Sequence, residues 1–432
     1  MRDISKKILS TVLRTESRLV LWKYKPKVVA ITGSVGKTST KDALYAALSK
    51  MAYVRKSDKS YNSELGLPLT VLGCPNGWND PVIWTKNILK GLWLFIWPHK
   101  YPKWLVLEVG VGKPGDMKTT ASWLQTDAVV ITAIGDLPAH IEFFNSRNHL
   151  IEEKSGLIKT LKKEGILILN HDDEAVMGMK EKTKSRVITF GMSEGSDVLG
   201  SEENIWYDKD AKPEGIVFRA DVGGSSLPVA IEGLFGKNHV YASLATLAFI
   251  YSIKLNVLSA IESLKNYDFP PGRMRILSGI NDSTIIDDTY NSSPFACESA
   301  LRTLGGVKSN GRKIAVLGDM LELGKHTKEA HEGMGKLAKE QADVMVAVGP
   351  RSEATRDGAL GAGMAESNVF YFLNSTLAGE FLQTFVGAGD LVLVKGSQGM
   401  RMERAVEAIL EDKANKEKLL VRQDKEWLAK KW

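Results

Sequence analysis

A short glycine-rich loop most constrains the fold of this chain. It reads Gly33-Ser34-Val35-Gly36-Lys37-Thr38-Ser39 and joins an apolar run at 28–31 to a helix-permissive segment at 41–48. Glycines in such a loop let backbone N–H groups converge on phosphate oxygens at a helix N-terminus. Lys37 supplies a positive charge, and the Thr38 hydroxyl is suited to hold Mg²⁺. The loop therefore predicts that the chain binds a nucleoside triphosphate.

The spacing within this loop departs from the generic phosphate loop, which has a longer spacer between its two glycines. Here only Ser34 and Val35 separate Gly33 from Gly36. A glycine turn beside a solvated lysine is the alternative interpretation. The order of strand, loop and helix favours the phosphate cradle, because a simple turn does not require that order.

The composition is that of a globular protein. The chain has 432 residues, of which 44% are hydrophobic and 25% charged, enough for about two or three domains. Its two cysteines, Cys74 and Cys297, have no paired spacing. This argues against a disulfide framework and a cysteine-ligated metal, and it fits a reducing cytosol. We expect no membrane span, which needs roughly 20 apolar residues, and no signal peptide.

The basic excess of the chain is confined to an N-terminal arm, residues 1–27. The arm carries eight Lys/Arg and two acidic residues, which accounts for the whole formal charge of +6. The balanced remainder argues against a nucleic-acid partner. Ile4, Ile8, Val12 and Leu13 recur at helical spacing, so the arm is expected to be a helix. It either packs on its own domain, which is favoured, or lies on an anionic membrane surface.

An aromatic-rich stretch covers residues 83–104. Two apolar stripes at four-residue spacing run through it, interrupted and flanked by lysines: Ile88, Leu92 and Ile96, and Leu89, Trp93 and Trp97. The favoured interpretation is a helix buried on one face, and the alternative is contact with a membrane interface. A peripheral contact with the inner face of a membrane would therefore use residues 1–27 or 83–104.

Short apolar runs alternate with helical stretches along most of the chain, as they do in parallel α/β units. The runs at 104–110, 128–134 and 165–170 are expected to be central strands of one open sheet. Pro270-Pro271-Gly272 breaks the pattern, and a second alternating series follows. We expect the arm at 1–27, a central domain at 28–269 and a C-terminal α/β domain at 270–432.

Chemically active residues stand at several predicted strand ends. Open α/β sheets bind ligands beyond the carboxyl ends of their strands. In this chain, polar, charged or glycine-rich segments follow five predicted strands: the loop 32–38, Glu108, Asp287-Asp288, Gly318-Asp319 and 395–397.

Five segments, in this order, resemble the Mur ligases: TGSVGKTS, LEVGVGKPGDM, DDTYNSSP, LGDMLELG and LVKGS. Within that family they resemble the MurF branch, which adds D-alanyl-D-alanine to the peptidoglycan precursor. That branch has DDxYNANP, and Ser293 stands here where its asparagine is usual. The resemblance covers roughly residues 28–410. It implies an α/β fold with a central P-loop-type ATPase domain built on a parallel sheet, followed by a Rossmann-like C-terminal domain.

The resemblance implies an enzyme, a cytoplasmic ATP-dependent ligase of peptidoglycan synthesis. ATP would phosphorylate a substrate carboxylate, and an amine would displace phosphate from the resulting acyl phosphate. Mg²⁺ ions would neutralise the charge on the phosphate oxygens, with Thr38 and Glu108 as oxygen ligands. Lys37 and Glu108 are expected catalytic residues. Glu108 ends an apolar run, so a surface role is the weaker interpretation.

The segment 139–158 resembles the family in a second way. The Mur ligases place a lysine that becomes carbamylated fourteen residues after a histidine, and His140 and Lys154 reproduce that spacing. A carbamate is an anion that can ligate a second Mg²⁺, which a protonated lysine cannot do. The resemblance thus implies catalytic and metal-binding roles for His140 and Lys154. An ordinary surface lysine is the alternative.

Further nucleotide contacts are implied by the resemblance. The family has a GxHN-type segment near adenine, and here the two residues are transposed, so that Asn238 or His239 would supply the contact. Arg273 matches an arginine that reaches the phosphates from the C-terminal domain. Asp288 and Asn291 match positions near the ribose and base. Nucleotide ligands on both sides of a domain boundary imply closure on binding.

The incoming amine is expected on the C-terminal side of the site. Lys395 and Ser397 resemble the KGS segment of the family, with Asp319 nearby, although Lys-Gly-Ser is also a common turn. The stretch that begins at Asn62 and includes Gly66 and Pro68 resembles NxxxGxP. That stretch serves either substrate placement or loop structure.

The expected substrates are UDP-MurNAc-tripeptide and D-alanyl-D-alanine. Members of the branch carry a further domain of about a hundred residues ahead of the phosphate loop, which holds the uridine nucleotide. Only residues 1–27 precede the first predicted strand, so this domain is expected to be absent. The alternatives are a ligase for another carboxylate acceptor, such as polyglutamate or another envelope polymer, and a non-catalytic nucleotide-binding partner.

Overall fold

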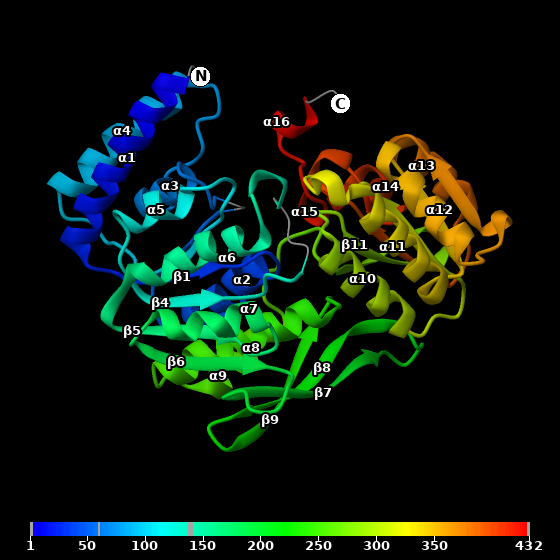
Figure 1. Cartoon of the computed structure of the whole chain (residues 1–432), viewed down its shortest axis with the longest axis horizontal. Helices are drawn as coiled ribbons and strands as arrows, with labels where there is room; N and C mark the ends of the chain where they lie inside the picture. The colour runs from blue at the N-terminus through cyan, green and yellow to red at the C-terminus, as the bar shows by residue number, and fades with distance from the viewer. Residues whose placement is uncertain (1–2, 59–60, 137–140, 430–432) are drawn as a thin grey trace.

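Two sheets, one of nine strands and one of six, organise this computed structural model, which describes residues 3–58, 61–136 and 141–429 (Figure 1). The nine-stranded sheet has the order β2-β3-β1-β4-β5-β6-β7-β8-β9. Its strands are β1 (Lys27–Thr32), β2 (Val54–Lys56), β3 (Trp104–Glu108), β4 (Thr126–Ile131), β5 (Leu161–Asn170), β6 (Arg186–Gly191), β7 (Val198–Tyr207), β8 (Pro213–Val222) and β9 (Ser225–Glu232). The three predicted central strands are confirmed as β3, β4 and β5.

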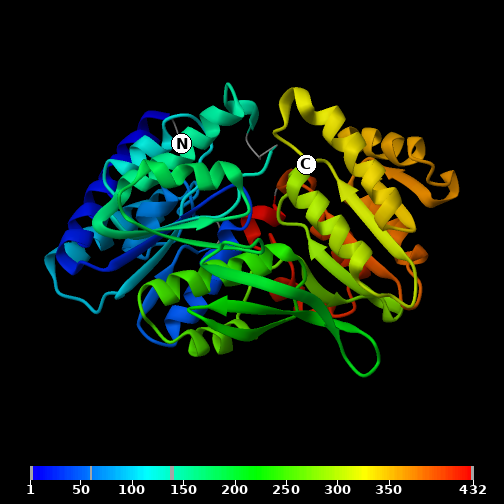
Figure 2. The ribbon, with the colours of Figure 1, turned by 60° about the horizontal axis from the view of Figure 1, so that its bottom comes forward.

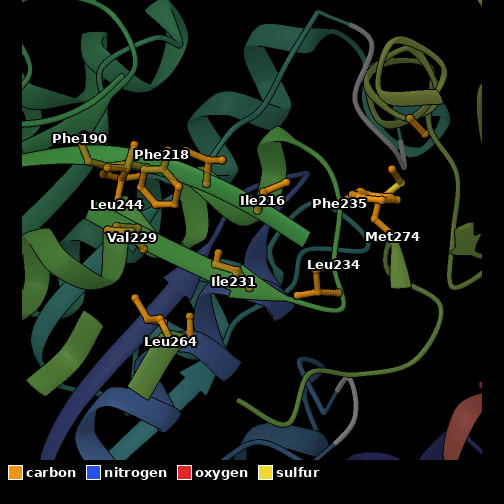
Figure 3. Close-up of a cluster of buried hydrophobic side chains, with 14 of the residues drawn as sticks. Phe190, Ile216, Phe218, Val229, Ile231, Leu234, Phe235, Leu244, Leu264 and Met274 are labelled. Carbon is orange, nitrogen blue, oxygen red and sulfur yellow. The ribbon is translucent and has the colours of Figure 1, made fainter. Parts of the chain in front are cut away.

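The predicted parallel sheet is confirmed from β2 to β7, and antiparallel strands extend its far edge. From β2 to β7 all pairs are parallel, but β8 pairs antiparallel with both β7 and β9. Gly223 and Gly224, with φ of 57° and 81°, form the tight turn between β8 and β9. Figure 3 shows apolar side chains of this edge, such as Phe218 and Val229, gathered with Leu244 of helix α8 (Lys237–Ser252) in the core.

Helices cover both faces of the nine-stranded sheet. Helix α2 (Lys37–Ser49), which follows the loop that leaves β1, packs against α8 and α9 (Val257–Leu264). The remaining helices of this part are α1 (Asp3–Tyr24), α3 (Gly66–Leu72), α4 (Pro81–Ile96), α5 (Asp116–Ala121), α6 (Arg147–Ser155) and α7 (Glu174–Met177). Among the described residues, none of the helices combines the length and the apolar character that crossing a bilayer requires.

The six-stranded sheet has the order β10-β11-β15-β12-β13-β14, in which only β10 is antiparallel to its neighbour. Its strands are β10 (Arg275–Ser278), β11 (Thr284–Asp288), β12 (Lys313–Gly318), β13 (Val344–Val348), β14 (Val369–Phe372) and β15 (Leu391–Lys395). Its helices are α10 (Pro294–Gly306), α11 (Thr327–Gln341), α12 (Glu353–Gly361), α13 (Ser375–Phe385), α14 (Glu403–Ile409), α15 (Lys416–Leu419) and α16 (Lys425–Leu428). Figure 2 shows the C-terminal tail between the two sheets.

The N-terminal arm is helical, as predicted, and α1 packs on α3 and α4. The buried face agrees with the predicted stripe only in part. Leu13 of the stripe is buried, together with Leu9 and Val20, whereas Ile8 is 61% exposed. Ile8 and Leu9 are adjacent apolar residues, so helical spacing alone does not decide which of the two turns inward.

The contact between α1 and α4 contains an unpaired carboxyl group. Glu16 is 4% exposed, and neither of its carboxyl oxygens has a hydrogen-bond partner among the described residues. A Cβ built on Gly91 would lie 2.2 Å from Glu16 Oε2, so the glycine leaves the space that the carboxyl occupies. Burial raises the pKa of Glu16 from 4.5 to about 7.

We expect Glu16→Gln to stabilise the protein at pH 8. A raised carboxyl pKa means that the folded state binds a proton more tightly than the unfolded state, so stability falls as pH rises from about 4.5 through 7. Glutamine removes this loss, which we put at about 1–2 kcal/mol. Thermal unfolding at pH 5 and pH 8 measures it, with Glu262→Gln, on an exposed helix face, as the control. If Glu16→Gln and Glu262→Gln changed the melting temperature equally at pH 8, the raised pKa of Glu16 would be contradicted.

Candidate functional site

The glycine loop lies at the carboxyl ends of β1 and β4. Gly33 and Gly36 have φ of 147° and 86°, and α2 begins at Lys37. A Cβ on Gly33 would meet Thr132 Oγ1 at 2.0 Å, so only glycine lets the loop pass this close to the end of β4. The backbone N–H of Ser34 donates to the carbonyl of Ala133 at 2.6 Å. The loop is thereby tied to the neighbouring strand at the N-terminus of a helix.

Two lysines converge on one carbonyl oxygen of this loop. Lys37 Nζ donates to the Gly33 oxygen at 2.8 Å, and Lys154 Nζ, from α6, donates to the same oxygen at 3.0 Å. Lys154 is 2% exposed. Burial, and secondarily the Lys37 charge, hold the pKa of Lys154 well below its ordinary value. The pKa of Lys37 is also lowered, chiefly by burial. Both lowered pKa values favour the neutral amine over the ammonium ion, most strongly at Lys154.

A second cluster joins the two sheets at Thr38. Its hydroxyl donates to Glu108 Oε2 at 2.8 Å and accepts from the Arg273 guanidinium at 2.9 Å. Asn62 Nδ2 donates to Glu108 Oε1 at 3.0 Å. The guanidinium of Arg273 lies 4.0 Å from the centre of the Tyr290 ring. Residues 235 positions apart thus meet at the loop, and Glu108, only 1% exposed, is held at the end of β3 facing it.

A cavity of about 650 Å³ opens beside the loop. This volume is within the range of small-molecule sites. Its lining comes from the loop and α2, from the segments after β4 and β5, from α6 and α8, and from the start of α10. The polar and aromatic lining residues include Thr132, Arg147, Asn148, Asn170, Asp172, Asp173, Phe190, Asn238, Tyr241 and Phe295.

The transposed residues at the start of α8, Asn238 and His239, occupy different environments. Asn238 lines the cavity, whereas the His239 ring is buried and bonds through Nε2 to the backbone oxygen of Arg273 at 2.9 Å. Burial lowers the pKa of His239 to about 4, so the ring is neutral. The His239 ring therefore holds the backbone of Arg273 in place through this hydrogen bond. Tyr241, two residues after His239, donates to Asp172 Oδ2 at 2.7 Å.

The loops of the six-stranded sheet meet at the carboxyl ends of β11, β12 and β15. Lys395 Nζ donates to Asp288 Oδ2 at 2.5 Å and to the carbonyl of Asn291 at 3.0 Å. Burial raises the pKa of Asp288, and Lys395 opposes that rise. Ser397 Oγ accepts from the N–H of Leu321 at 2.9 Å. Lys395 and Ser397 therefore tie neighbouring loops together.

Asp319 is completely buried beyond β12. Its Oδ1 accepts from the backbone N–H and the hydroxyl of Ser352, both at 2.8 Å. Arg351 approaches its Oδ2 to 3.6 Å. This acid, expected near the amine, is thus held beside an arginine that is half exposed.

The C-terminal tail reaches the same region through Arg422, which sequence reasoning missed. Arg422 NH1 donates to the carbonyl of Thr289 at 3.1 Å and to Glu403 Oε2 at 3.0 Å, and its NH2 donates to the carbonyl of Tyr290. Tyr290 carries the ring beneath Arg273. A lone arginine in a charged tail gives no signal in the sequence.

We expect Arg422→Ala to raise the KM for ATP and to lower stability by about 2 kcal/mol. The change removes backbone contacts that orient Tyr290, and it leaves a buried carboxylate with one partner fewer. Steady-state kinetics and thermal unfolding measure the two effects. Lys418→Ala, an exposed change in the same tail, is the control. Unchanged KM would show that the tail is only a structural brace.

Three further expected residues are His140, Gly66 and Pro68. His140 lies outside the described residues, so its place relative to Lys154 is not described. Gly66 and Pro68 lie within α3, and a Cβ on Gly66 would meet the Tyr61 backbone at 2.6 Å. The described part of the chain contains no cluster of three or more His, Cys, Asp or Glu side chains arranged to hold a metal.

Comparisons with known proteins agree with this geometry. The family model of the Mur ligase middle domain matches residues 31–250, and that of the Mur ligase, glutamate ligase domain matches residues 272–398. The UDP-N-acetylmuramoyl-tripeptide–D-alanyl-D-alanine ligase of Bacillus subtilis is 26% identical over 402 residues, which cover 93% of this chain and 79% of the relative.

A solved structure is similar over a comparable length. The MurF ligase from Thermotoga maritima in complex with ADP superposes with a TM-score of 0.76 at 27% identity, covering 92% of this chain and 83% of that one. The two family models together account for most of the sequence. The chain belongs to the Mur ligase family.

Proposed function

We propose that the chain is an ATP-dependent ligase that joins D-alanyl-D-alanine to the tripeptide of UDP-MurNAc-tripeptide, in peptidoglycan precursor synthesis in the cytoplasm. The observation that carries this proposal is the bond from Arg273 to Thr38, which brings the two domains together at the phosphate loop beside Glu108. The names of the relatives supply the substrates.

ATP would lie with its phosphates on the loop and its base in the neighbouring cavity. Backbone N–H groups from Gly36 to Ser39 stand at the N-terminus of α2, where they favour an anion. Lys37 would move from the Gly33 carbonyl to the phosphates. Asn238 supports the base contact because it lines the cavity, and His239 would act indirectly through the backbone of Arg273.

The residues beside the loop fit Mg²⁺. Thr38 and Glu108 offer a hydroxyl and a carboxylate oxygen 2.8 Å apart, and both are hard donors. Mg²⁺ is usually held by one or two protein ligands together with substrate phosphates, so a cluster of three side chains is not required. When bound, the ion would neutralise charge on the transferred phosphoryl group. Asn62 would hold the Glu108 carboxylate in place.

Carbamylation of Lys154 is supported by its surroundings. Carbon dioxide reacts with a neutral amine, and burial beside Lys37 favours the neutral form of Lys154. The reaction converts the amine and carbon dioxide into a carbamate and releases one proton. The new anion would lie next to Lys37 and the loop, where it would serve as a further metal ligand together with His140.

The chemistry would then proceed in two steps. An oxygen of the tripeptide carboxylate attacks the γ-phosphorus, the bond between the γ-phosphorus and the bridging oxygen breaks, and ADP leaves with that electron pair. The dipeptide ammonium loses one proton to solvent, and its amine then attacks the acyl carbon. The acyl C–O bond breaks, phosphate leaves with that electron pair, and the new amide nitrogen gives up its second proton. Arg273 and Lys37 would stabilise the charge of the first step. Asp319, Lys395 and Ser397 would shape the amine side, because their loops meet at that edge of the second sheet. Asp288 and Asn291, which Lys395 contacts, would approach the ribose and base of the nucleotide.

We also propose the division into an arm at 1–27, a central domain at 28–269 and a C-terminal domain at 270–432. The separation of the two sheets supports it, since one sheet ends with Glu232 and the other begins with Arg275.

The test is product formation by the purified chain with ATP and Mg²⁺. We expect phosphate release and a pentapeptide product, detected by mass, only when both UDP-MurNAc-tripeptide and D-alanyl-D-alanine are present. Lys37→Ala should abolish both signals, and Lys50→Ala, on the exposed end of α2, should not. ATP binding without product would overturn the substrate assignment, and polyglutamate acceptors would then be assayed.

A further inference from the structure

Exposed apolar side chains gather on one pair of helices. Large apolar residues that are more than one third exposed are scattered over most of the molecule, but eight belong to α1, α4 or the residue after α4. They are Ile8, Trp22, Val82, Leu89, Leu92, Trp93, Ile96 and Trp97. We call these eight residues the α1/α4 face. Clustering of this kind marks an interaction site more often than scattered exposure does.

Helix α4 is apolar on two opposite faces. Trp84, Asn87, Gly91 and Leu94 are buried, at the spacing of one helix face. The opposite face carries Leu89, Leu92, Trp93 and Ile96, which are 60%, 42%, 50% and 59% exposed. Helix α4 is therefore buried on one face, as predicted, but the predicted apolar stripes lie mainly on its exposed face. The outer apolar face of α4 is thus exposed to solvent in this chain.

Helix α1 holds α4 firmly and extends its apolar face. Lys23 Nζ donates to the carbonyls of Leu94, Phe95 and Trp97, at 3.1, 2.7 and 2.7 Å. These bonds cap the end of α4, beside which Trp22 is 70% exposed. The two helices therefore present one prearranged surface.

The charge around this surface is almost entirely positive. Residues 1–27 and 81–103 carry twelve Lys/Arg and two acidic residues, of which Glu16 is buried. The rest of the chain carries 45 basic and 49 acidic residues. Exposed basic residues of the two helices include Lys7, Arg18, Lys86 and Lys90.

We propose that the α1/α4 face docks on the surface of an anionic phospholipid bilayer, with both helices lying along the membrane plane. An apolar helix face, tryptophans and a basic surround are the features of interfacial helices. The charge favours a membrane over a second copy of this chain, because a symmetric dimer would place two basic surfaces against each other.

Docking in this way leaves the nucleotide site open. In Figure 1 the α1 and α4 helices lie along the outer edge of the molecule, on the far side from α11, α12 and α13. The cavity beside the loop is lined by α2, α6, α8 and α10 and by none of the residues of the α1/α4 face. A docked molecule would therefore keep its cleft accessible to solutes.

Vesicle flotation of the full chain tests this proposal. We expect the protein to float with vesicles of equal parts phosphatidylglycerol and phosphatidylcholine, and not with phosphatidylcholine alone. Leu89→Gln/Trp93→Gln/Ile96→Gln should weaken binding at least about tenfold, since it removes most of the apolar contact. Lys7→Gln/Arg18→Gln should weaken it about fivefold for each charge. Raising the salt to about 1 M should have a similar effect.

Matched controls replace equal numbers of exposed apolar or basic residues with glutamine outside the α1/α4 face. Leu258→Gln/Leu373→Gln/Leu377→Gln changes three exposed leucines on other elements, and Lys209→Gln/Lys254→Gln removes two exposed charges; neither should alter flotation. Phosphate release with both substrates should stay the same in all variants, so the result does not depend on the ligase assignment. The proposal would be overturned if the wild-type chain did not float with the anionic vesicles, or if the control variants lost as much binding as the test variants. A dimer in light scattering that the triple variant converts to a monomer would also overturn it.

Discussion

Replacement of Lys154 by alanine is expected to lower ligase turnover by at least about a thousandfold while ATP still binds. The amine is buried at the loop, 3.0 Å from the Gly33 carbonyl, and its neutral form is the one that reacts with carbon dioxide. Without it the site loses the anion proposed to balance the metal charge. Short carboxylates such as formate should restore part of the activity of the alanine variant, because they can enter the vacated space.

The carbamate itself can be observed directly. Wild-type protein equilibrated with ¹³C-labelled bicarbonate should give a carbamate carbon signal that Lys154→Met, which keeps the side-chain volume, lacks. Acidification protonates the amine, so signal and activity should fall together and return with bicarbonate at neutral pH. Lys159→Ala, an exposed lysine five positions on, should behave as wild type. Full activity in a protein without the signal would refute carbamylation.

Replacement of Arg273 by alanine is expected to lower kcat by about a hundredfold to a thousandfold. This arginine crosses from the second domain to bond with Thr38, and its guanidinium stacks on Tyr290. An interaction that forms when the domains meet stabilises charge in the transition state more than in the ground state. The KM for ATP should therefore change less than kcat.

A conservative variant separates charge from geometry at this position. Arg273→Lys should recover only part of the activity, because lysine neither stacks as a plane nor donates two directed bonds. Arg302→Ala, on the exposed face of α10, serves as the control. An Arg273→Ala enzyme with unchanged kcat and a much higher KM would mean that the residue only binds ATP.

The phosphate loop, the central strands and the second α/β series could all be predicted from the sequence. Each is a local pattern: a glycine spacing, a run of branched residues, or a break at Pro270-Pro271-Gly272. Glu108 could also be singled out, because an acid at the end of an apolar strand is unusual. The structure places it within hydrogen-bond distance of Thr38.

Local patterns could not predict features that depend on tertiary packing. The transposed pair Asn238 and His239 reads as equivalent in sequence, yet one lines the cavity and the other bonds the Arg273 backbone. The antiparallel edge β7–β9 has one local signal in the sequence, the two-glycine turn Gly223-Gly224. The apolar stripes of α4 predict a buried face, because such stripes usually pack against the core. In the structure the buried face of α4 instead contains Trp84 and Gly91.

One isotope measurement tests the central claim most directly. Tripeptide precursor labelled with ¹⁸O in its terminal carboxylate is incubated with the chain, ATP, Mg²⁺ and D-alanyl-D-alanine, and the released phosphate is analysed by mass. The acyl-phosphate route predicts that each phosphate carries one ¹⁸O from the carboxylate and that pentapeptide forms in equal amount. Unlabelled phosphate, or phosphate released without pentapeptide, would contradict the account and leave an ATPase in place of a ligase.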